Sequence, residues 1–215
     1  VESSFNQMQV SHAIELGFAD GVRALMRQDP DIVMIGEIRD LETAEMAIQA
    51  ALTGHLVLST LHTNDAPSAI TRLLDLGVPA YLINSTLLGV MAQRLVRTLC
   101  PHCKKPVQMR EEQRAAWRAL VAPWKSAEPT QIWQPVGCLE CRMTGYSGRV
   151  GVYEILVNSP EIRRMIKPLT EIPKLREQAF REGMRPLRIS GALKVAQGIT
   201  SLEEVIKVAP PSDDS

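Results

Sequence analysis

The hydrophobic and polar positions in the N-terminal half of the chain follow two alternating patterns, one typical of strands and one typical of helices. Residues 32–35 form a short apolar run between a turn signal and Gly36, which predicts a strand buried on both faces. Residues 55–61 form a second β-rich run, and the weak alternation of residues 5–10 suggests a third strand. Apolar residues at helical spacing predict helices over residues 18–27, 41–52, 65–76 and 81–95.

Capping residues support two of these helices. Asp40 is the expected N-cap of the helix over 41–52, and Asn64 or Asp65 is the expected N-cap of the next helix. Strands and helices that alternate at this spacing predict an α/β fold with a parallel sheet and helices packed on it. Functional groups are then expected beyond the carboxyl ends of the strands, which here carry Glu37 and His62.

The composition changes after Leu95. Residues 97–151 hold all four cysteines and all three tryptophans, with many prolines and glycines, and are expected to form a small irregular appendage. A strand-like run then covers 152–156, and Ser201 with Glu204 fits a capping box. Short helices are predicted over 160–165, 172–181, 187–197 and 201–208, and the polar residues after Pro210 are expected to be disordered.

The overall composition is that of a globular protein. The 215 residues are 45% hydrophobic and 22% charged, and the formal net charge is zero. A zero net charge argues against bulk electrostatic binding to nucleic acid or to an anionic membrane. No apolar run reaches the roughly 20 residues that cross a bilayer, and the start does not resemble a signal peptide, so a cytosolic location is expected. Val1 is not Met, which suggests a start inside a longer reading frame.

The first candidate for chemistry is the acidic end of the strand over 32–35. P-loop nucleotidases use such a strand to place a carboxylate near Mg²⁺ and the γ-phosphate of the nucleotide. Glu37 is the candidate carboxylate, and Gly36 would allow the backbone to approach a ligand closely. The alternative interpretation is a buried strand followed by an exposed charged turn.

Two histidines and two arginines are further candidates. His55 and His62 flank the second strand at an odd separation, which places them on opposite faces and argues against a shared metal ion. His62, at the carboxyl end, could contact a phosphate or the attacking water, whereas a structural role is expected for His55. Arg23 and Arg27 lie four positions apart on one helical face, where they could clamp a phosphate or form surface ion pairs.

The four cysteines form two Cys-x-x-Cys pairs. Two such pairs in a cytosolic chain predict a structural zinc site with four thiolate ligands, although reduced thiols without metal are the alternative. The segment between the pairs is longer than in the usual zinc ribbon and must close back on itself. His102 lies inside the first pair and is not expected to be a ligand. The expected ligands are Cys100, Cys103, Cys138 and Cys141.

Several strings, in order along nearly the whole chain, resemble the type II secretion and type IV pilus extension ATPases. Residues 27–40 resemble their Walker B region, and residues 53–64 resemble their histidine box. Residues 92–101 and 145–154 resemble the two ends of their tetracysteine zinc subdomain, and residues 197–205 resemble their C-terminal end. Each string alone is a weak indication of this family, but their occurrence together and in order is highly specific.

The resemblance implies a partial RecA-like P-loop ATPase core over residues 1–97, without Walker A. A zinc-binding subdomain over 98–151, a helical C-terminal part over 152–209 and a disordered tail over 210–215 would follow. The whole protein would be a hexameric motor at the cytoplasmic face of the bacterial inner membrane, using ATP, Mg²⁺ and Zn²⁺ to assemble pilin-like subunits. Its implied partners are inner-membrane platform and cytoplasmic adaptor proteins, with no nucleic acid.

The resemblance also assigns roles to single residues. Glu37 corresponds to the Walker B acid and His62 to a residue of the histidine box. Arg23 and Arg27 match the arginines that the family places near the nucleotide, and Glu2 matches the last part of its aspartate box. The four cysteines correspond to the zinc ligands.

One departure from the family pattern changes the expected activity. The chain has no Gly-x4-Gly-Lys-Ser/Thr, so the Walker A loop would lie upstream of Val1, as would the N-terminal domain. Without the loop's lysine and backbone amides little holds the triphosphate, and the chain alone is expected to be inactive. The alternative is a standalone zinc-containing interaction module or a degenerate subunit. A nucleic-acid-binding zinc protein is disfavoured by the zero net charge and the few aromatic residues.

Overall fold

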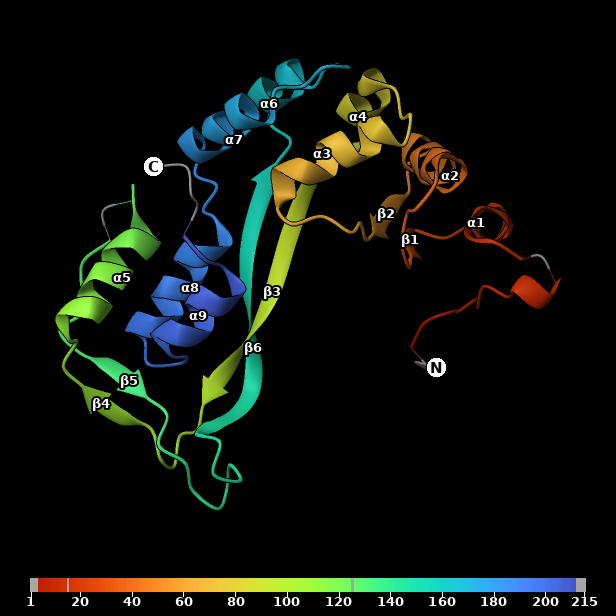
Figure 1. Ribbon diagram of the computed structural model, residues 1–215. Helices are drawn as coiled ribbons and strands as arrows, with labels where there is room; N and C mark the ends of the chain where they lie inside the picture. The colour runs from red at the N-terminus through yellow and green to blue at the C-terminus, as the bar shows by residue number, and fades with distance from the viewer. Residues whose placement is uncertain (1–3, 15, 125, 212–215) are drawn as a thin grey trace. The chain divides into compact units, whose positions relative to one another are not determined.

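A computed structural model of the chain describes residues 4–14, 16–124 and 126–211. The chain divides into two compact units, each built from two segments (Figure 1). The first unit takes its described residues from Val1–Val90 and Leu156–Arg181, and the second takes them from Met91–Ile155 and Glu182–Ser215. The consecutive domain boundaries expected from the sequence stay a prediction.

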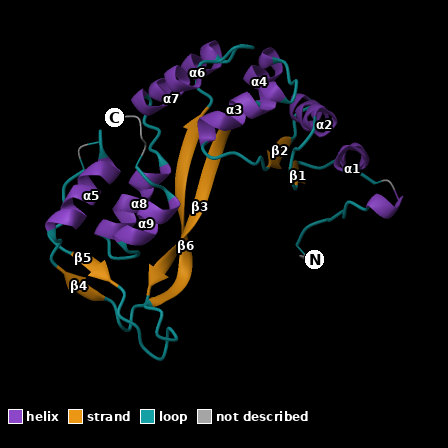
Figure 2. Ribbon diagram, viewed as in Figure 1, coloured by secondary structure: helices purple, strands orange, loops and turns teal. Residues whose placement is uncertain are grey.

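A strand–helix–strand motif forms the centre of the first unit. Strands β1 (Ile32–Ile35) and β2 (Leu56–Ser59) pair in parallel, and helix α2 (Leu41–Leu52) connects them (Figure 2). The carboxylate of Asp40 accepts a hydrogen bond from the backbone N–H of Thr43 at 2.8 Å and caps α2, as the sequence predicts. The α/β class with a parallel sheet is therefore confirmed.

The two strands bury only one of their faces. Val33 and Ile35 of β1 are buried against Val22 of α1 (Phe18–Leu25) and against α2. The opposite face of the strand pair exposes the apolar side chains Ile32, Met34, Leu56 and Leu58. The prediction of a strand buried on both faces is therefore wrong for β1 in this chain, because both helices pack on the same face.

The remaining elements of the first unit are helical. Asp65, rather than Asn64, caps α3 by accepting a hydrogen bond from the backbone N–H of Ser68 at 2.8 Å. No strand forms within residues 4–10, contrary to the expectation. The other elements are η1 (His12–Ile14), η2 (Met26–Gln28), α3 (Ala66–Asp75), α4 (Ala80–Thr86), α6 (Pro160–Met165) and α7 (Ile172–Arg181).

The helix expected over residues 81–95 is confirmed only for its first part, and the prediction is wrong for the rest. Helix α4 ends at Thr86, and strand β3 (Gly89–Leu99) begins at Gly89 and pairs with strand β6 (Tyr146–Val157). Gly89 permits this pairing because a Cβ at that position would lie 2.7 Å from the carbonyl oxygen of Leu156. A short apolar run does not distinguish a strand from a helix by itself, and here the distant partner strand decides.

The second unit combines most of strands β3 and β6 with three helices and a smaller strand pair. Strands β4 (Lys105–Val107) and β5 (Ile132–Gln134) pair antiparallel, and helix α5 (Glu111–Val121) lies between them in sequence. The segment expected to be irregular therefore contains an 11-residue helix. Helices α8 (Leu187–Ala196) and α9 (Leu202–Val208) pack with α5 around a core that includes Trp117, Leu120, Ile132, Val195, Leu202 and Val205.

The capping box expected at the start of α9 has two hydrogen bonds, and the structure shows one of them. The hydroxyl of Ser201 accepts a hydrogen bond from the backbone N–H of Glu204 at 3.3 Å. The carboxylate of Glu204 pairs instead with Arg97 of β3. In the part of the chain that the structure describes, no helix is long and apolar enough to cross a membrane.

Candidate functional site

Glu37 and His62 meet at the carboxyl edge of the parallel strand pair. Glu37 follows β1 through Gly36, and His62 follows β2. Nε2 of His62 lies 3.1 Å from Oε2 of Glu37. The side chain of Glu37 is 21% exposed and that of His62 is 82% exposed. Parallel strands end at the same edge of a sheet, which explains how residues 25 positions apart come together.

Backbone and hydroxyl hydrogen bonds hold the two loops next to each other. The N–H of Ile38 donates to the carbonyl oxygen of Thr60 at 3.0 Å. The hydroxyl of Thr60 donates to the carbonyl oxygen of Gly36 at 2.6 Å. The segment that carries Glu37 is thus tied directly to the segment that carries His62.

Arg39 is a third member of this cluster, and the sequence reasoning missed it. Its Nε donates a hydrogen bond to Oε2 of Glu37 at 2.6 Å. This hydrogen bond, with a further contribution from His62, outweighs burial and lowers the pKa of Glu37. The spacing of Glu37 and Arg39 was an available signal, because side chains two positions apart in an extended segment point to the same side.

The cluster combines an ionised carboxylate with an imidazole and a guanidinium. A carboxylate in this state can accept a hydrogen bond from a water molecule or attract a metal cation. The imidazole of His62 is exposed enough to reach a group that binds at the same edge. Such an arrangement suits the chemistry of a phosphorylated ligand with a bound cation.

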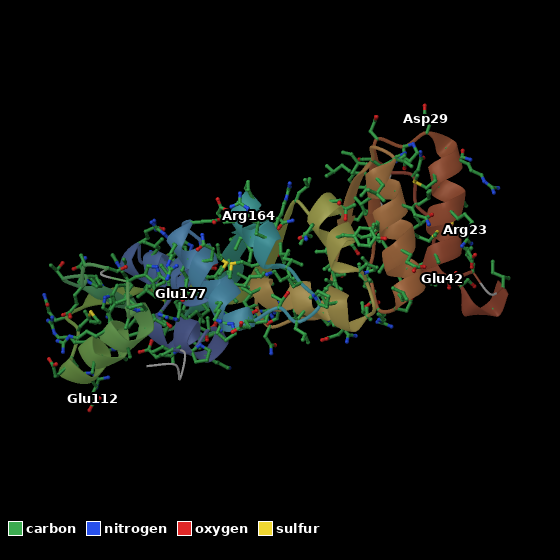
Figure 3. The ribbon with its side chains drawn as sticks, turned by 90° about the horizontal axis from the view of Figure 1, so that it is seen from above. Arg23, Asp29, Glu42, Glu112, Arg164 and Glu177 are labelled. Carbon is green, nitrogen blue, oxygen red and sulfur yellow. The ribbon has the colours of Figure 1, made fainter. Side chains whose placement is uncertain are left out.

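The two candidate arginines differ in their surroundings. Arg23 lies on α1 and pairs with Asp20 at 2.7 Å. It also pairs at 3.7 Å with Glu42 of α2, and both of these residues are labelled in Figure 3. Arg27 lies beyond the end of α1, in the 3₁₀ turn η2, so the two do not share one continuous α-helix. Arg27 has no ion-pair partner among the residues that the structure describes. Their role near a nucleotide stays a prediction.

The remaining two candidate residues of the first unit are Glu2 and His55. Glu2 lies outside the described residues. Nδ1 of His55 lies 2.9 Å from the carbonyl oxygen of Ala50, at the end of α2. This contact fits the structural role expected for His55.

The four cysteines gather in one cluster of the second unit. Their sulfur atoms all lie within 4.8 Å of one another. Sγ of Cys100 is 3.9 Å from Sγ of Cys138, and Sγ of Cys141 is 3.8 Å from Cys103 and 3.7 Å from Cys138. A tetrahedral site with metal–sulfur bonds of about 2.3 Å has sulfur atoms about 3.8 Å apart. The cluster therefore has the dimensions of a four-thiolate zinc site.

Backbone N–H groups donate to two of the sulfurs, which favours thiolates. Gly137 donates to Sγ of Cys103 at 3.3 Å, and Cys138 and Gly145 each donate to Sγ of Cys141 at 3.2 Å. Burial raises the pKa of Cys141, but the two backbone bonds to its sulfur and hydrogen bonds from the Cys138 and Cys103 thiols outweigh burial and lower the pKa to about 6. The pKa of Cys138 is raised to about 11, because burial and neighbouring thiols outweigh a backbone hydrogen bond that lowers it. The donor set and its hydrogen bonds fit Zn²⁺.

Comparison with known families identifies the family of the chain. Residues 2–207 match the family model described as type II/IV secretion system protein. The chain therefore belongs to this family.

Similar proteins of known name belong to secretion and pilus-assembly systems, and several of them are named as ATPases. The chain is 59% identical over 210 residues to the type IV pilus assembly ATPase TfpB of Acinetobacter baylyi, covering 98% of the chain and 35% of that protein. It is 49% identical over 210 residues to the type II secretion system ATPase E of Vibrio cholerae, covering 96% of the chain and 40% of that protein. The chain thus spans about two fifths or less of these relatives.

Solved structures support the same class. The ATPase DotB of Legionella pneumophila aligns with 91% of the chain and 43% of its own chain, at 25% identity and a TM-score of 0.61. The pilus retraction motor PilT, solved with bound ADP, aligns with 93% of the chain and 45% of its own chain, at 27% identity and a TM-score of 0.58.

Proposed function

We propose that the chain is part of a motor ATPase that couples ATP binding and hydrolysis to type II secretion or type IV pilus assembly. The observation that carries this proposal is the contact of Glu37 with His62 at the carboxyl edge of the parallel strands. The names of the relatives support the same activity. In this proposal residues 1–97 form part of a RecA-like core.

Each residue of the cluster has a role in this proposal. Glu37 is the Walker B acid, whose carboxylate polarises the attacking water or holds the water shell of Mg²⁺. His62 contacts a phosphate oxygen or the attacking water. Mg²⁺ supplies charge neutralisation on the phosphates when it is bound. Arg23, Arg27 and Glu2 contribute to the nucleotide site.

The cysteine cluster holds a structural Zn²⁺ in this proposal. The tetrahedral spacing of the sulfurs and the N–H bonds to them support the assignment. Four protein ligands leave no open position, so the metal stabilises the fold instead of taking part in hydrolysis.

The assembly proposed for the whole protein is a homo-hexamer at the cytoplasmic face of the bacterial inner membrane. Its partners are the membrane platform and the cytoplasmic adaptor proteins of a secretion or pilus machine. Support comes from the machines named for the relatives.

The chain alone should hydrolyse ATP at or near the background rate, because it contains no phosphate-binding loop. Phosphate release from ATP with Mg²⁺, measured for this chain and for the complete gene product, tests the proposal. A measurable rate only in the complete protein is expected. A magnesium-dependent rate in the chain alone, abolished by Glu37→Gln, would contradict it.

A further inference from the structure

Asp65 uses both of its carboxylate oxygens, and they bind two different parts of the first unit. Oδ1 accepts the capping hydrogen bond from the backbone N–H of Ser68 in α3. Oδ2 accepts a hydrogen bond at 2.8 Å from the guanidinium of Arg176, which lies on α7, 111 positions later in the sequence. One side chain therefore joins the start of α3 to a helix near the other end of the first unit's sequence.

The loop that carries His62 lies between this junction and a second anchor. At its beginning, Thr60 is bonded to the loop after β1, through its carbonyl oxygen and its hydroxyl. At its end, the hydroxyl of Thr63 donates to the carbonyl oxygen of Asp65 at 3.2 Å. The position of His62 thus depends on both ends, and Arg176 is the side chain that holds the second end from outside the loop.

The ion pair of Asp65 and Arg176 is partly shielded from water. The side chains are 26% and 31% exposed, respectively. Burial alone would raise the pKa of Asp65, but the hydrogen bonds from Ser68 and the charge of Arg176 outweigh burial and lower the pKa. A charged hydrogen bond in such surroundings is stronger than one between fully exposed side chains.

Helix α7, which carries Arg176, is packed within the first unit. Leu175 and Ala179 of α7 are buried, and α7 packs against α3. Among the described residues, the other ion pairs of α7 are local, since Lys174 pairs with Glu171 just before the helix and Arg181 pairs with Glu177 inside it. Among the described ion pairs of α7, the one from Arg176 reaches the histidine loop.

We propose that Arg176 is a positioning residue that holds the loop carrying His62 in place through Asp65. The catalytic consequence of this inference rests on the proposed function, whereas the anchoring itself does not. In the protein, Arg176 limits the motion of residues 60–68, and its loss lets His62 leave the edge where it contacts Glu37.

Hydrogen–deuterium exchange of the backbone amides in residues 60–68, followed by mass spectrometry, tests the anchoring. Arg176→Gln should speed this exchange about 3- to 10-fold, since one partly shielded ion pair is lost. Arg181→Gln is the matched control, because it removes an ion pair from the same helix without touching the loop, and it should leave the exchange unchanged. Equal exchange in Arg176→Gln and Arg181→Gln would overturn the proposal.

Two further variants separate the ion pair from the helix cap. Asp65→Asn keeps a side-chain oxygen that can cap α3 but removes the charge, so it should speed the exchange as Arg176→Gln does. The double variant should exchange no faster than either single variant. Arg176→Lys retains the charge and should restore part of the protection. Additive effects of the two single variants would show independent roles and overturn the proposal.

ATP hydrolysis by the complete protein tests the consequence for the site. Arg176→Gln should lower kcat about 3- to 10-fold, leave KM for ATP unchanged, and be partly rescued by Arg176→Lys. A loosened loop with an unchanged kcat would make Arg176 purely structural and overturn the positioning role. If the unmodified complete protein hydrolyses no ATP, the proposed function fails, and the exchange experiment still decides the anchoring.

Discussion

Arg97 of β3 and Glu204 of α9 form an ion pair across 107 positions of the sequence. Glu204 also accepts a hydrogen bond from the backbone N–H of Arg97 at 3.3 Å, and its side chain is 8% exposed. The guanidinium of Arg97 lies 4.0 Å from the ring centre of Tyr146, whose hydroxyl is 2.9 Å from the hydroxyl of Ser201. This network ties α9 to β3 and β6 within the second unit.

The ion pair of Arg97 and Glu204 predicts how the stability of the second unit depends on pH. The hydrogen bond from Arg97 is the main reason that the pKa of Glu204 is lowered from its ordinary 4.5. Such a carboxyl stabilises the fold above pH 4.5 and loses this contribution as the pH falls through its lower folded-state pKa. We expect Glu204→Gln to cost about 1–3 kcal/mol of unfolding free energy at pH 7 and to flatten the loss of stability in acid.

Urea unfolding at a series of pH values measures this effect. Tryptophan fluorescence reports on the second unit, because Trp117, Trp124 and Trp133 all belong to it. Glu112→Gln, an exposed carboxyl on α5, is the control and should behave as the unmodified chain does. An acid dependence that is the same with and without Glu204 would contradict the assigned role.

The cysteine cluster predicts one bound zinc ion for each chain and a fold that depends on it. Cys141→Ser removes the sulfur that accepts two backbone N–H bonds. It should abolish zinc binding and lower the thermal midpoint of the second unit, because metal binding contributes to folding free energy. Elemental analysis and thermal unfolding measure the two effects.

His102 provides the matched control for the zinc prediction. It lies between the first two cysteines in the sequence and is exposed. His102→Ala should therefore leave the zinc content unchanged. Full zinc content in Cys141→Ser, or loss of zinc in His102→Ala, would show that the ligand set is wrong.

Because β1 has one exposed face, substitutions at neighbouring positions of this strand should differ in their effect on the free energy of unfolding. Met34 is 70% exposed, whereas Val33 is 2% exposed. Val33→Ala should cost about 1–3 kcal/mol of unfolding free energy in this chain, whereas Met34→Lys should change it by less than about 0.5 kcal/mol.

A second expected result follows from the same face. Met34→Lys should weaken the binding of an apolar dye such as ANS, because an exposed apolar patch binds such dyes and promotes association. Dye fluorescence and urea unfolding of both variants measure these effects. Destabilisation by Met34→Lys as large as that by Val33→Ala would mean that this face is covered.

Short-range signals in the sequence were sufficient to predict the helix caps and the residues that meet at the carboxyl edge of the sheet. Asp40, Asp65 and Ser201 each bond to an N–H three positions later, so a few residues contain the whole interaction. The meeting of Glu37 and His62 could also be predicted, because the geometry of parallel strands places their ends together.

Interactions between distant segments could not be predicted in the same way. Residues 89–95 form a strand because β6 pairs with them, and no local pattern indicates that partner. The contact of Arg176 with Asp65 depends on the packing of α7 against α3. Glu204 fits a capping box, yet its carboxylate binds Arg97, since a guanidinium gives the buried charge a stronger partner.

The central claim is that Glu37 serves ATP hydrolysis, and magnesium-dependent hydrolysis by the complete protein tests it most directly. Glu37→Gln should lower kcat by about 10²-fold or more while ATP binding persists, since it removes the carboxylate but keeps the shape of the side chain. Glu45→Gln, an exposed carboxyl on α2, is the control and should keep the full rate. A full rate in Glu37→Gln would contradict the account.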